Sequence, residues 1–402
     1  MLGNQLGSPG VQAVNASPPA EHRSSPRPRV NLYFVNPSDC RPSMDRYGRT
    51  LERALRYLDP PLDVHTVTPP AWPPRDDSPF GRLAENVGKY RVRYAGYPRL
   101  VSGESATVHH VIDHSYAHLV PALDPRRTVV TCHDLMLLRM ADGLIPAARP
   151  SRIALLAFRH AVGHLPRAAG IACVSRATAS DVHRYLDCDP ARVHVVHSGV
   201  AEHFQAPPAE RTAQLRRRLG LPNVPLVLHV GGTDSYKNIE GALRVIHAVR
   251  QTHGLNCAFV KAGERLTTEQ RRLGQRLGLQ PWIAETGYVP EPDLPTLYAC
   301  CQVLLAPSHW EGFGWPALEA MACGTPAVTS DCAALREVVG AAALQAPATD
   351  TRGLAAAVAR LLQDDEVRRS RQAGGLALVQ RFRWDRTARA LVEIYASVAA
   401  AA

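Results

Sequence analysis

Long hydrophobic runs are absent from this chain, since no apolar stretch approaches the ~20 residues that a bilayer-spanning helix needs. The sequence therefore argues against a membrane-spanning protein, and its start shows no secretory signal. It contains 9 cysteines, but none forms a CxxC pair or stands in zinc-ligand spacing. Such scattered thiols fit a reducing compartment, and we expect a cytoplasmic location.

Lysine is also scarce, occurring only as Lys89, Lys237 and Lys261, so the net charge of +10 comes almost entirely from arginine. A basic surface suits anionic lipid, phosphorylated acceptors or nucleic acid. No zinc-finger, RNP-like or basic-zipper pattern accompanies the charge, so nucleic acid is not expected as a partner. The length of 402 residues and the hydrophobic content of 46% predict two domains with apolar cores.

The order of segments along the chain predicts an α/β protein. Residues 1–29 are rich in Pro, Ser, Gly and Ala, which is typical of a disordered tail. Beyond them, apolar strand-like runs alternate with helical patterns, which implies parallel sheets covered by helices. We expect strands at 30–35, 108–113, 128–132, 170–175 and 193–196, and then at 226–230, 257–263, 303–307 and 326–330. Between the two series, 201–225 is predicted to be a linker with one short helix.

The most informative segment runs from Glu311 to Pro326 and reads EGFGWPALEAMACGTP, with seven residues between Glu311 and Glu319. The glycines let a loop pass close to a ligand, and Pro316 suits the first turn of a helix. A helix start offers free N–H groups and a positive dipole end, which suit a diphosphate. Because the two carboxylates can accept hydrogen bonds from hydroxyls, the segment predicts a site for a sugar nucleotide.

This E-x7-E spacing, within the pattern EGFG-x-P-x-LEA-x-A-x-G-x-P, resembles the motif of retaining glycosyltransferases of family 4 (glycosyl transferases group 1). The resemblance implies the GT-B fold, in which two Rossmann-like doubly wound domains face a cleft. It assigns acceptor binding to residues 30–200 and nucleotide-sugar binding to 201–383, and a C-terminal helix, 384–402, crosses back to the first domain. The implied reaction moves a sugar from a nucleotide-diphosphate sugar to a hydroxyl with retention of anomeric configuration, in cell-surface polysaccharide or glycolipid synthesis.

On the donor side, a strand, a glycine turn and a helix start follow one another in the segment 231–239, which is an anion-binding arrangement. Lys237 adds a point charge suited to phosphate. The segment resembles the donor loop of the family, although many members carry Arg in the place of Gly232. The resemblance implies donor contacts from Gly231, Gly232, Thr233, Lys237, Asn238, Glu264, Tyr288, Val289, Glu311, Gly312, Phe313, Gly314, Leu318 and Glu319.

Within this set, the resemblance assigns Glu319 to the ribose hydroxyls and Glu311 to the donor sugar. His133, which follows a strand end together with Asp134, is expected near that sugar, where an imidazole can donate, accept or shuttle a proton. We therefore predict His133, Glu311 and Lys237 as the catalytic residues. Since Lys237 and helix N-termini can stabilise charge on the leaving diphosphate, neither a cofactor nor a metal is expected.

The acceptor expected from the resemblance is a glycan or a lipid-linked sugar. Arg46, Arg49, Arg53 and Arg56 recur at helical spacing on one face, and 149–167 is a second basic amphipathic segment. Such a face either meets an anionic membrane or an acceptor phosphate, or is simply solvated. A membrane contact places the protein peripherally on the inner face. Two alternatives to the transferase stay open, namely an inactive scaffold that binds a sugar nucleotide and a sugar-nucleotide epimerase on the same fold.

Overall fold

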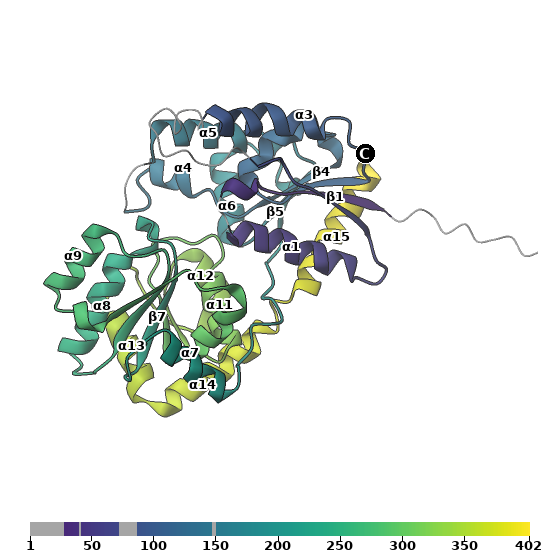
Figure 1. Cartoon of the computed structure of the whole chain (residues 1–402). Coiled ribbons are helices and arrows are strands. Elements are labelled where there is room, and N and C mark those ends of the chain that lie inside the picture. Colours follow the sequence, from purple (N-terminus) through teal and green to yellow (C-terminus); the bar gives the residue numbers. More distant parts are fainter. Residues whose placement is uncertain (1–27, 40–41, 72–86, 147–149) are drawn as a thin grey trace, which may run out of the picture.

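The computed structural model describes residues 28–39, 42–71, 87–146 and 150–402. In these residues the chain forms two lobes, each built on a six-stranded parallel sheet with helices on its faces (Figure 1). The strand order is β2-β1-β3-β4-β5-β6 in the first sheet and β12-β11-β10-β7-β8-β9 in the second. Both orders are those of doubly wound folds, and the second is that of dinucleotide-binding domains. The predicted fold class is confirmed.

The first lobe buries the centre of its sheet completely. Strands β3, β4 and β5 are buried at every position, as expected for parallel strands covered on both faces. The strands of this sheet are β1 Arg29–Tyr33, β2 Asp63–Val67, β3 Val108–Val111, β4 Thr128–Cys132, β5 Gly170–Cys173 and β6 Val193–Val195.

The second lobe is built on six parallel strands. Its strands are β7 Leu226–Gly231, β8 Ala258–Gly263, β9 Ile283–Gly287, β10 Val303–Ala306, β11 Ala327–Ser330 and β12 Leu344–Ala346. Every strand expected from the sequence is present, whereas β2, β9 and β12 were not expected. All three lie at an edge of their sheet and are mostly half-buried, so their sequences need no continuous apolar run.

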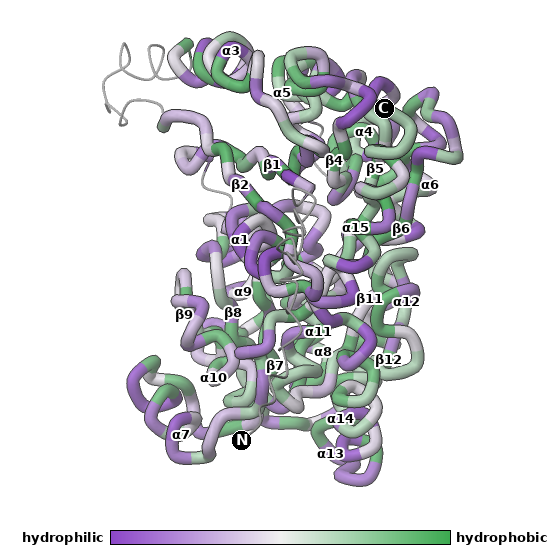
Figure 2. Tube along the Cα trace, turned by 90° about the vertical axis from the view of Figure 1, so that its right-hand side faces the viewer, coloured by the Kyte–Doolittle hydropathy of each residue, from purple (hydrophilic) through white to green (hydrophobic). Residues whose placement is uncertain are grey.

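Helices cover the sheets and, within the described residues, none combines the length and apolar character needed to cross a bilayer. In the tube of Figure 2, hydrophobic positions gather along the strands, while the outer helix α7 is largely hydrophilic. The helices of the first lobe are α1 Pro42–Arg56, α3 Tyr97–Val101, α4 Met136–Ala141, α5 Arg152–Val162 and α6 Arg176–Tyr185. Those of the second are α7 Ala209–Arg218, α8 Ile239–Gln251, α9 Thr268–Arg276, α10 Leu294–Ala299, α11 Trp315–Ala322, α12 Ala333–Val339, α13 Thr351–Gln363 and α14 Asp365–Val379.

The last helix, α15 Trp384–Ala401, leaves the second lobe and runs along the first, as the yellow ribbon of Figure 1 shows. Its buried residues Leu391, Ile394 and Val398 join the apolar cluster between α1 and the first sheet. The chain thus crosses between lobes twice, and the two crossings are joined where Val200 N–H donates to Phe382 O at 2.8 Å. The predicted crossover helix is present. The predicted tail, 1–29, falls almost entirely outside the described residues, and Arg29 already belongs to β1.

Candidate functional site

A cleft of about 1050 Å³ lies between the lobes and is lined by loops from both of them. The strand order reverses between β7 and β10 in the second sheet and between β1 and β3 in the first. Loops that leave the carboxyl ends of strands at such a point diverge, and ligands bind there in doubly wound folds. The structure brings these predicted site residues to the cleft wall: His133, Gly231, Gly232, Glu264, Tyr288 and Val289.

Lys237 and Glu311 form a nearly buried charged pair next to the second-lobe side of the cleft, behind Tyr236. Lys237 Nζ donates to Glu311 Oε1 at 2.8 Å and Oε2 at 3.0 Å, and Ser308 Oγ donates to Oε1 at 2.7 Å. The two side chains are 13% and 12% exposed. Burial alone would lower the pKa of Lys237, but the Glu311 carboxylate outweighs it and raises that pKa above its ordinary value. The ammonium is therefore charged throughout the physiological range, beside the cleft-lining ring of Tyr236, 5.2 Å away.

Asn238 holds this loop in place rather than facing the cleft. Its backbone is left-handed with φ of 56°, and its Oδ1 accepts from Gly241 N–H at the start of α8. Its Nδ2 donates to Pro307 O at 3.0 Å and Ala348 O at 2.9 Å. Because these bonds use both amide hydrogens of a buried side chain, the predicted donor contact of Asn238 is corrected to a supporting role.

Two glycines let the ends of β7 and β8 approach each other closely. Gly231 and Gly263 have φ of 138° and 94°, and a Cβ on Gly263 would lie 2.5 Å from Gly231 O. Glu264 then reaches over the turn, where its Oε2 accepts from Thr233 N–H at 2.9 Å and Thr233 Oγ1 at 3.0 Å. The predicted donor residues Gly231, Thr233 and Glu264 are thus one connected unit of the cleft wall.

Glu319 lies on the second turn of α11 and is reached from the first lobe. Arg46 Nη2 of α1 donates to its Oε1 at 2.5 Å, and Tyr298 OH donates to its Oε2 at 2.8 Å. The Glu319 side chain is 5% exposed. Each carboxylate oxygen can still accept a second hydrogen bond. Arg46 therefore connects the lobes through the glutamate that was predicted to bind ribose.

Two other predicted donor residues point their side chains into the core. Phe313 packs on Phe382 and Trp315, with ring centroids 5.8 and 6.3 Å away, and Leu318 is fully buried. Their side chains are therefore unavailable to a ligand, which leaves the backbone of this segment for the predicted donor contacts. Gly314, in contrast, has φ of 105° and a Cβ there would meet Leu335 at 2.5 Å, so only glycine fits.

His133 contributes to the site with its ring, which lines the cleft, and with its backbone carbonyl, which contacts the second lobe. Its Nε2 donates to Ile112 O at 2.9 Å, which leaves Nδ1 as the acceptor of a neutral imidazole. Burial lowers the pKa of His133, so the ring is neutral at physiological pH. A Cβ on Gly312 would lie 2.1 Å from His133 O, so this glycine is what allows the two lobes to touch. Ser175 Oγ in the first lobe also donates to Gly312 O at 2.7 Å.

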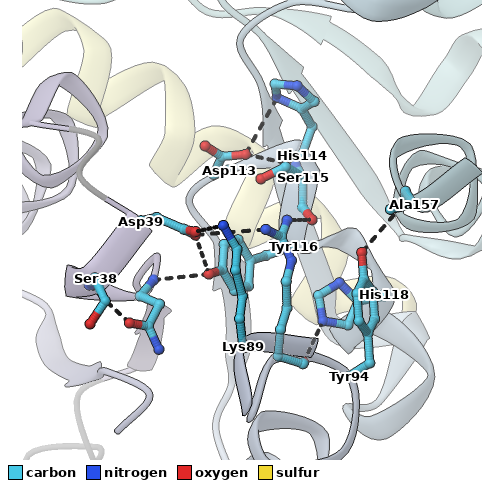
Figure 3. A network of polar contacts seen from close by, with 12 residues as sticks. Ser38, Asp39, Lys89, Tyr94, Asp113, His114, Ser115, Tyr116, His118 and Ala157 are labelled. Carbon is cyan, nitrogen blue, oxygen red and sulfur yellow. Dashed lines mark hydrogen bonds and ion pairs between the residues drawn. The ribbon is translucent and has the colours of Figure 1, made fainter. Parts of the chain in front are cut away.

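The first-lobe half of the cleft carries a polar network, which Figure 3 shows. At its centre Asp39 accepts from Tyr116 OH at 2.5 Å, with Lys89 Nζ and Arg93 Nη1 at 3.5 and 3.7 Å. The stacked rings of Tyr90 and Tyr94, 6.0 Å apart, lie on the same wall. Hydroxyls, charges and flat aromatic faces are the groups that recognise sugars by hydrogen bonding and stacking.

The predicted basic face of α1 is largely paired. Arg46 contacts Glu319, Arg49 contacts Asp45 at 2.8 Å, and Arg56 contacts Glu52 at 2.8 Å. The second basic segment contains α5, whose Ile153 and Leu156 are 69% and 66% exposed; Arg149 lies outside the described residues.

No group of three or more His, Cys, Asp or Glu side chains is placed to hold a metal ion in the part of the chain that the structure describes.

Several residues of the site were not predicted from the sequence. Ser308, Tyr298 and Arg46 each bind one of the paired glutamates, yet no local pattern marks them as partners. Arg46 was noticed only for its helical spacing with other arginines. The repeated arginine pattern carries no signal for the long-range contact, because that contact depends on how the lobes are set against each other.

Comparison with known proteins agrees with this geometry. A family described as "Glycosyltransferase Family 4" matches residues 44–204, and one described as "Glycosyl transferases group 1" matches residues 224–364. O-antigen chain mannosyltransferase B of Escherichia coli is 36% identical over 170 residues, which is 42% of this chain and 45% of that protein. Serotype-specific mannosyltransferase WbdA of Escherichia coli is 29% identical over 329 residues, 78% of this chain and 39% of that protein. The chain thus spans less than half the length of these two relatives.

Solved structures show the same fold. Sucrose-phosphate synthase from Thermosynechococcus elongatus superposes with a TM-score of 0.73 at 21% identity, over 94% of this chain and 100% of that one. Anabaena HepE in complex with UDP and glucose has a TM-score of 0.69 at 17% identity, over 92% and 100%. The two sheets, the crossover helix and the interlobe cleft define the GT-B class. With one family match on each lobe, the chain belongs to glycosyltransferase family 4, group 1.

Proposed function

We propose that the protein transfers a sugar from a nucleotide-diphosphate sugar, held by the second lobe, to a hydroxyl of a glycan or lipid-linked acceptor held by the first. The observation that carries this proposal is the convergence of Lys237, Glu311 and the glycine turn of β7 at the strand-order reversal of the second sheet. Similar proteins named as mannosyltransferases make mannose the first donor sugar to test, and the UDP and glucose in the HepE title support a nucleotide-sugar donor.

In the proposed reaction, charge builds on the diphosphate as the bond to the sugar breaks. The ammonium of Lys237 and the positive dipole end of α11 face this charge, so we propose that transfer needs no metal. Glu311 holds Lys237 in position and faces the donor sugar. The neutral Nδ1 of His133 is a hydrogen-bond acceptor for a sugar hydroxyl on the opposite wall.

We further propose retention of anomeric configuration. The two motif carboxylates are both engaged, Glu311 by Lys237 and Glu319 by Arg46 and Tyr298, so neither is free to flank a scissile bond. This arrangement suits attack by the acceptor on the face from which the diphosphate leaves, with the leaving phosphate taking the acceptor proton. Product anomers assigned by NMR test this step, and an inverted product contradicts it.

We also propose a peripheral contact with anionic membrane, through α5 rather than through the arginines of α1. The arginines of α1 are mostly paired, whereas α5 exposes Ile153 and Leu156 at the rim of the first-lobe half, beside the cleft-lining Ala154 and Phe158. Co-sedimentation with vesicles of anionic lipid should be lost in Ile153→Ser/Leu156→Ser and kept in Arg49→Ser/Arg53→Ser. The opposite pattern returns the contact to α1.

The central experiment is a thermal-shift screen with UDP-, GDP-, ADP- and dTDP-sugars, followed by turnover with an oligosaccharide acceptor. A ligand at a hundredfold excess over its Kd adds about 2.7 kcal/mol to the stability of the folded state. A transferase binds one donor and moves its sugar to the acceptor. A scaffold binds without turnover, an epimerase converts the donor without any acceptor, and absence of a shift with every donor overturns the proposal.

A further inference from the structure

Lys261 is a fully buried lysine on β8 that the proposed reaction does not use. Its ammonium contacts only backbone carbonyls, donating to Gly231 O at 2.7 Å, Glu264 O at 2.8 Å and Ala262 O at 3.1 Å. Among the residues that the structure describes, it makes no ion pair. Burying a charge without a contacting counter-ion costs folding free energy. This cost suggests that Lys261 has a role other than packing in the core.

The three carbonyls belong to the wall of the cleft. Gly231, Ala262 and Glu264 all line it, so the ammonium lies one backbone layer beneath the surface. Gly231 and Gly263 are register partners where β7 and β8 end, and Glu264 N–H donates to Gly231 O at 3.2 Å. One side chain thus ties the turn after β7 to the turn after β8.

The charges around this turn explain why a positive group beneath it matters. Lys237 is already paired with Glu311, and a Cβ on Gly232 would lie 3.2 Å from Asp234 Oδ2 and 3.3 Å from Glu264 Oε2. Two carboxylates therefore flank the turn at the surface. An anionic ligand at that turn needs a compensating positive potential, and Lys261 provides one that no contacting carboxylate cancels.

The hydrogen bonds of Lys261 also act through the peptide groups. A donor that binds Gly231 O polarises the peptide bond to Gly232 and makes the N–H of the cleft-lining Gly232 a stronger hydrogen-bond donor. The bond to Ala262 O does the same for Gly263 N–H. The ammonium thereby strengthens backbone donors without touching the ligand.

We propose that Lys261 is a positioning residue for the diphosphate of the donor, acting from beneath the glycine turns as a buried cation. This inference rests on the proposed function, because it assumes that a nucleoside diphosphate binds at the ends of β7 and β8. It adds a residue to that site and predicts that the contribution of Lys261 is specific to the phosphates.

The test compares a nucleoside diphosphate with its own phosphate-free nucleoside. Lys261→Gln keeps an amide that can donate to Gly231 O and Glu264 O but removes the charge. We expect its Kd for the tightest-binding member of UDP, GDP, ADP and dTDP to rise roughly tenfold, while the Kd for the matching nucleoside changes less than about twofold. Arg272→Met, which removes an exposed cation of α9 in the same lobe, should change neither.

The outcomes separate the two proposals. An equal loss for diphosphate and nucleoside shows that Lys261 only maintains the fold of the wall, and it overturns the inference alone. A wild-type protein that binds none of the four diphosphates overturns both the inference and the proposed function. The expected selective loss supports both.

A second measurement on the wild-type protein covers the case in which Lys261→Gln does not fold. Burial lowers the pKa of Lys261 to about 8, so the ammonium loses most of its proton between about pH 7 and 9. The charged groups that face it are His229 on β7, Glu285 on β9, Glu264 at the end of its own strand and Lys237 beyond β7. His229, with a pKa lowered by burial to about 3, and Lys237, with a raised pKa, do not titrate in this window.

The readout is the ratio of the Kd for the nucleoside diphosphate to the Kd for the nucleoside. Titration of the nucleobase affects both ligands equally and cancels in this ratio. We expect diphosphate affinity to fall several-fold relative to nucleoside affinity as the pH rises across this window. A ratio that stays constant overturns the inference.

Discussion

At the residue scale, the pair of Lys237 and Glu311 has two consequences, one for stability and one for chemistry. Both side chains are nearly buried, and each is the main partner of the other. Removing one leaves the other as an unpaired charge in a low-dielectric environment, which is costly. The pair also sets the protonation of the ammonium that faces the proposed diphosphate.

Lys237→Met should lower the free energy of unfolding by about 3 kcal/mol, because Glu311 is left buried with only Ser308 as a donor. It should also lower kcat by about 10²-fold or more, as loss of a transition-state donor does. Adding Glu311→Gln to this variant removes the unpaired charge and should restore part of the stability but none of the turnover. Denaturant unfolding and initial rates measure the two effects. A double variant that regains activity contradicts the proposed role of Lys237.

Gly312→Ala tests the contact between the lobes at a single atom. The new Cβ would lie 2.1 Å from His133 O, and neither backbone can yield, so the lobes must move apart. We expect turnover to fall about tenfold or more, since a shift of about 1 Å misaligns donor and acceptor. Gly374→Ala is the matched control: its Cβ meets nothing within 4 Å in helix α14, and the change should be neutral or slightly stabilising. Unchanged turnover in Gly312→Ala would show that the lobes are not in contact during catalysis.

At the scale of elements, α15 shows how a terminal helix can belong to a distant part of the chain. It follows the second lobe in sequence but buries its apolar face on the first, beside α1 and the central strands. Its period of apolar residues predicts a helix, and only the packing shows which lobe the helix stabilises.

Leu391→Ala should therefore destabilise the first lobe by about 3 kcal/mol, as truncation of a fully buried leucine does. Hydrogen exchange followed by mass spectrometry should show faster exchange in β1, β3 and β5, while β7, β8 and β10 remain as protected as in the wild type. Arg386→Ala, an exposed position on the same helix, should leave both lobes unchanged. Faster exchange confined to the second lobe would contradict the assignment of α15.

At the scale of the whole molecule, three histidines are distributed through both cores. His110, His118 and His229 are buried, and burial lowers the pKa of each to about 3. In the unfolded chain each takes up a proton near pH 6.5. Between these values the unfolded state binds more protons than the folded state, so stability falls as the pH falls.

We expect the free energy of unfolding to begin to fall below about pH 6.5 and to continue falling toward pH 3, with a slope of up to about 1.4 kcal/mol per pH unit for each histidine. Urea titrations at pH 7.5, 6 and 5 measure it. His229→Gln should reduce the slope by one proton, because the imidazole Nε2 has no hydrogen-bond partner and Gln does not titrate. A slope equal to that of the wild type would show that His229 is not neutral in the fold.

The sequence by itself determined the α/β class, the central strands and the core of the proposed donor site. Apolar runs between turns are local, and so is the glycine-rich loop before α11, since glycine and proline act on their own backbone. Those signals located Lys237, Glu311 and the glycine turns.

Only the tertiary structure decided which side chains face the ligand and which support the wall. Asn238, Phe313 and Leu318 stand in the right segment of the sequence but turn into the protein, whereas Arg46 arrives from far away in the chain to bind Glu319. Only the tertiary structure shows three further features: the edge strands, the packing of α15 on the first lobe and the burial of Lys261. Each depends on the packing of segments that are far apart in the sequence, and a local pattern of residues carries no information about which distant segment will be its neighbour.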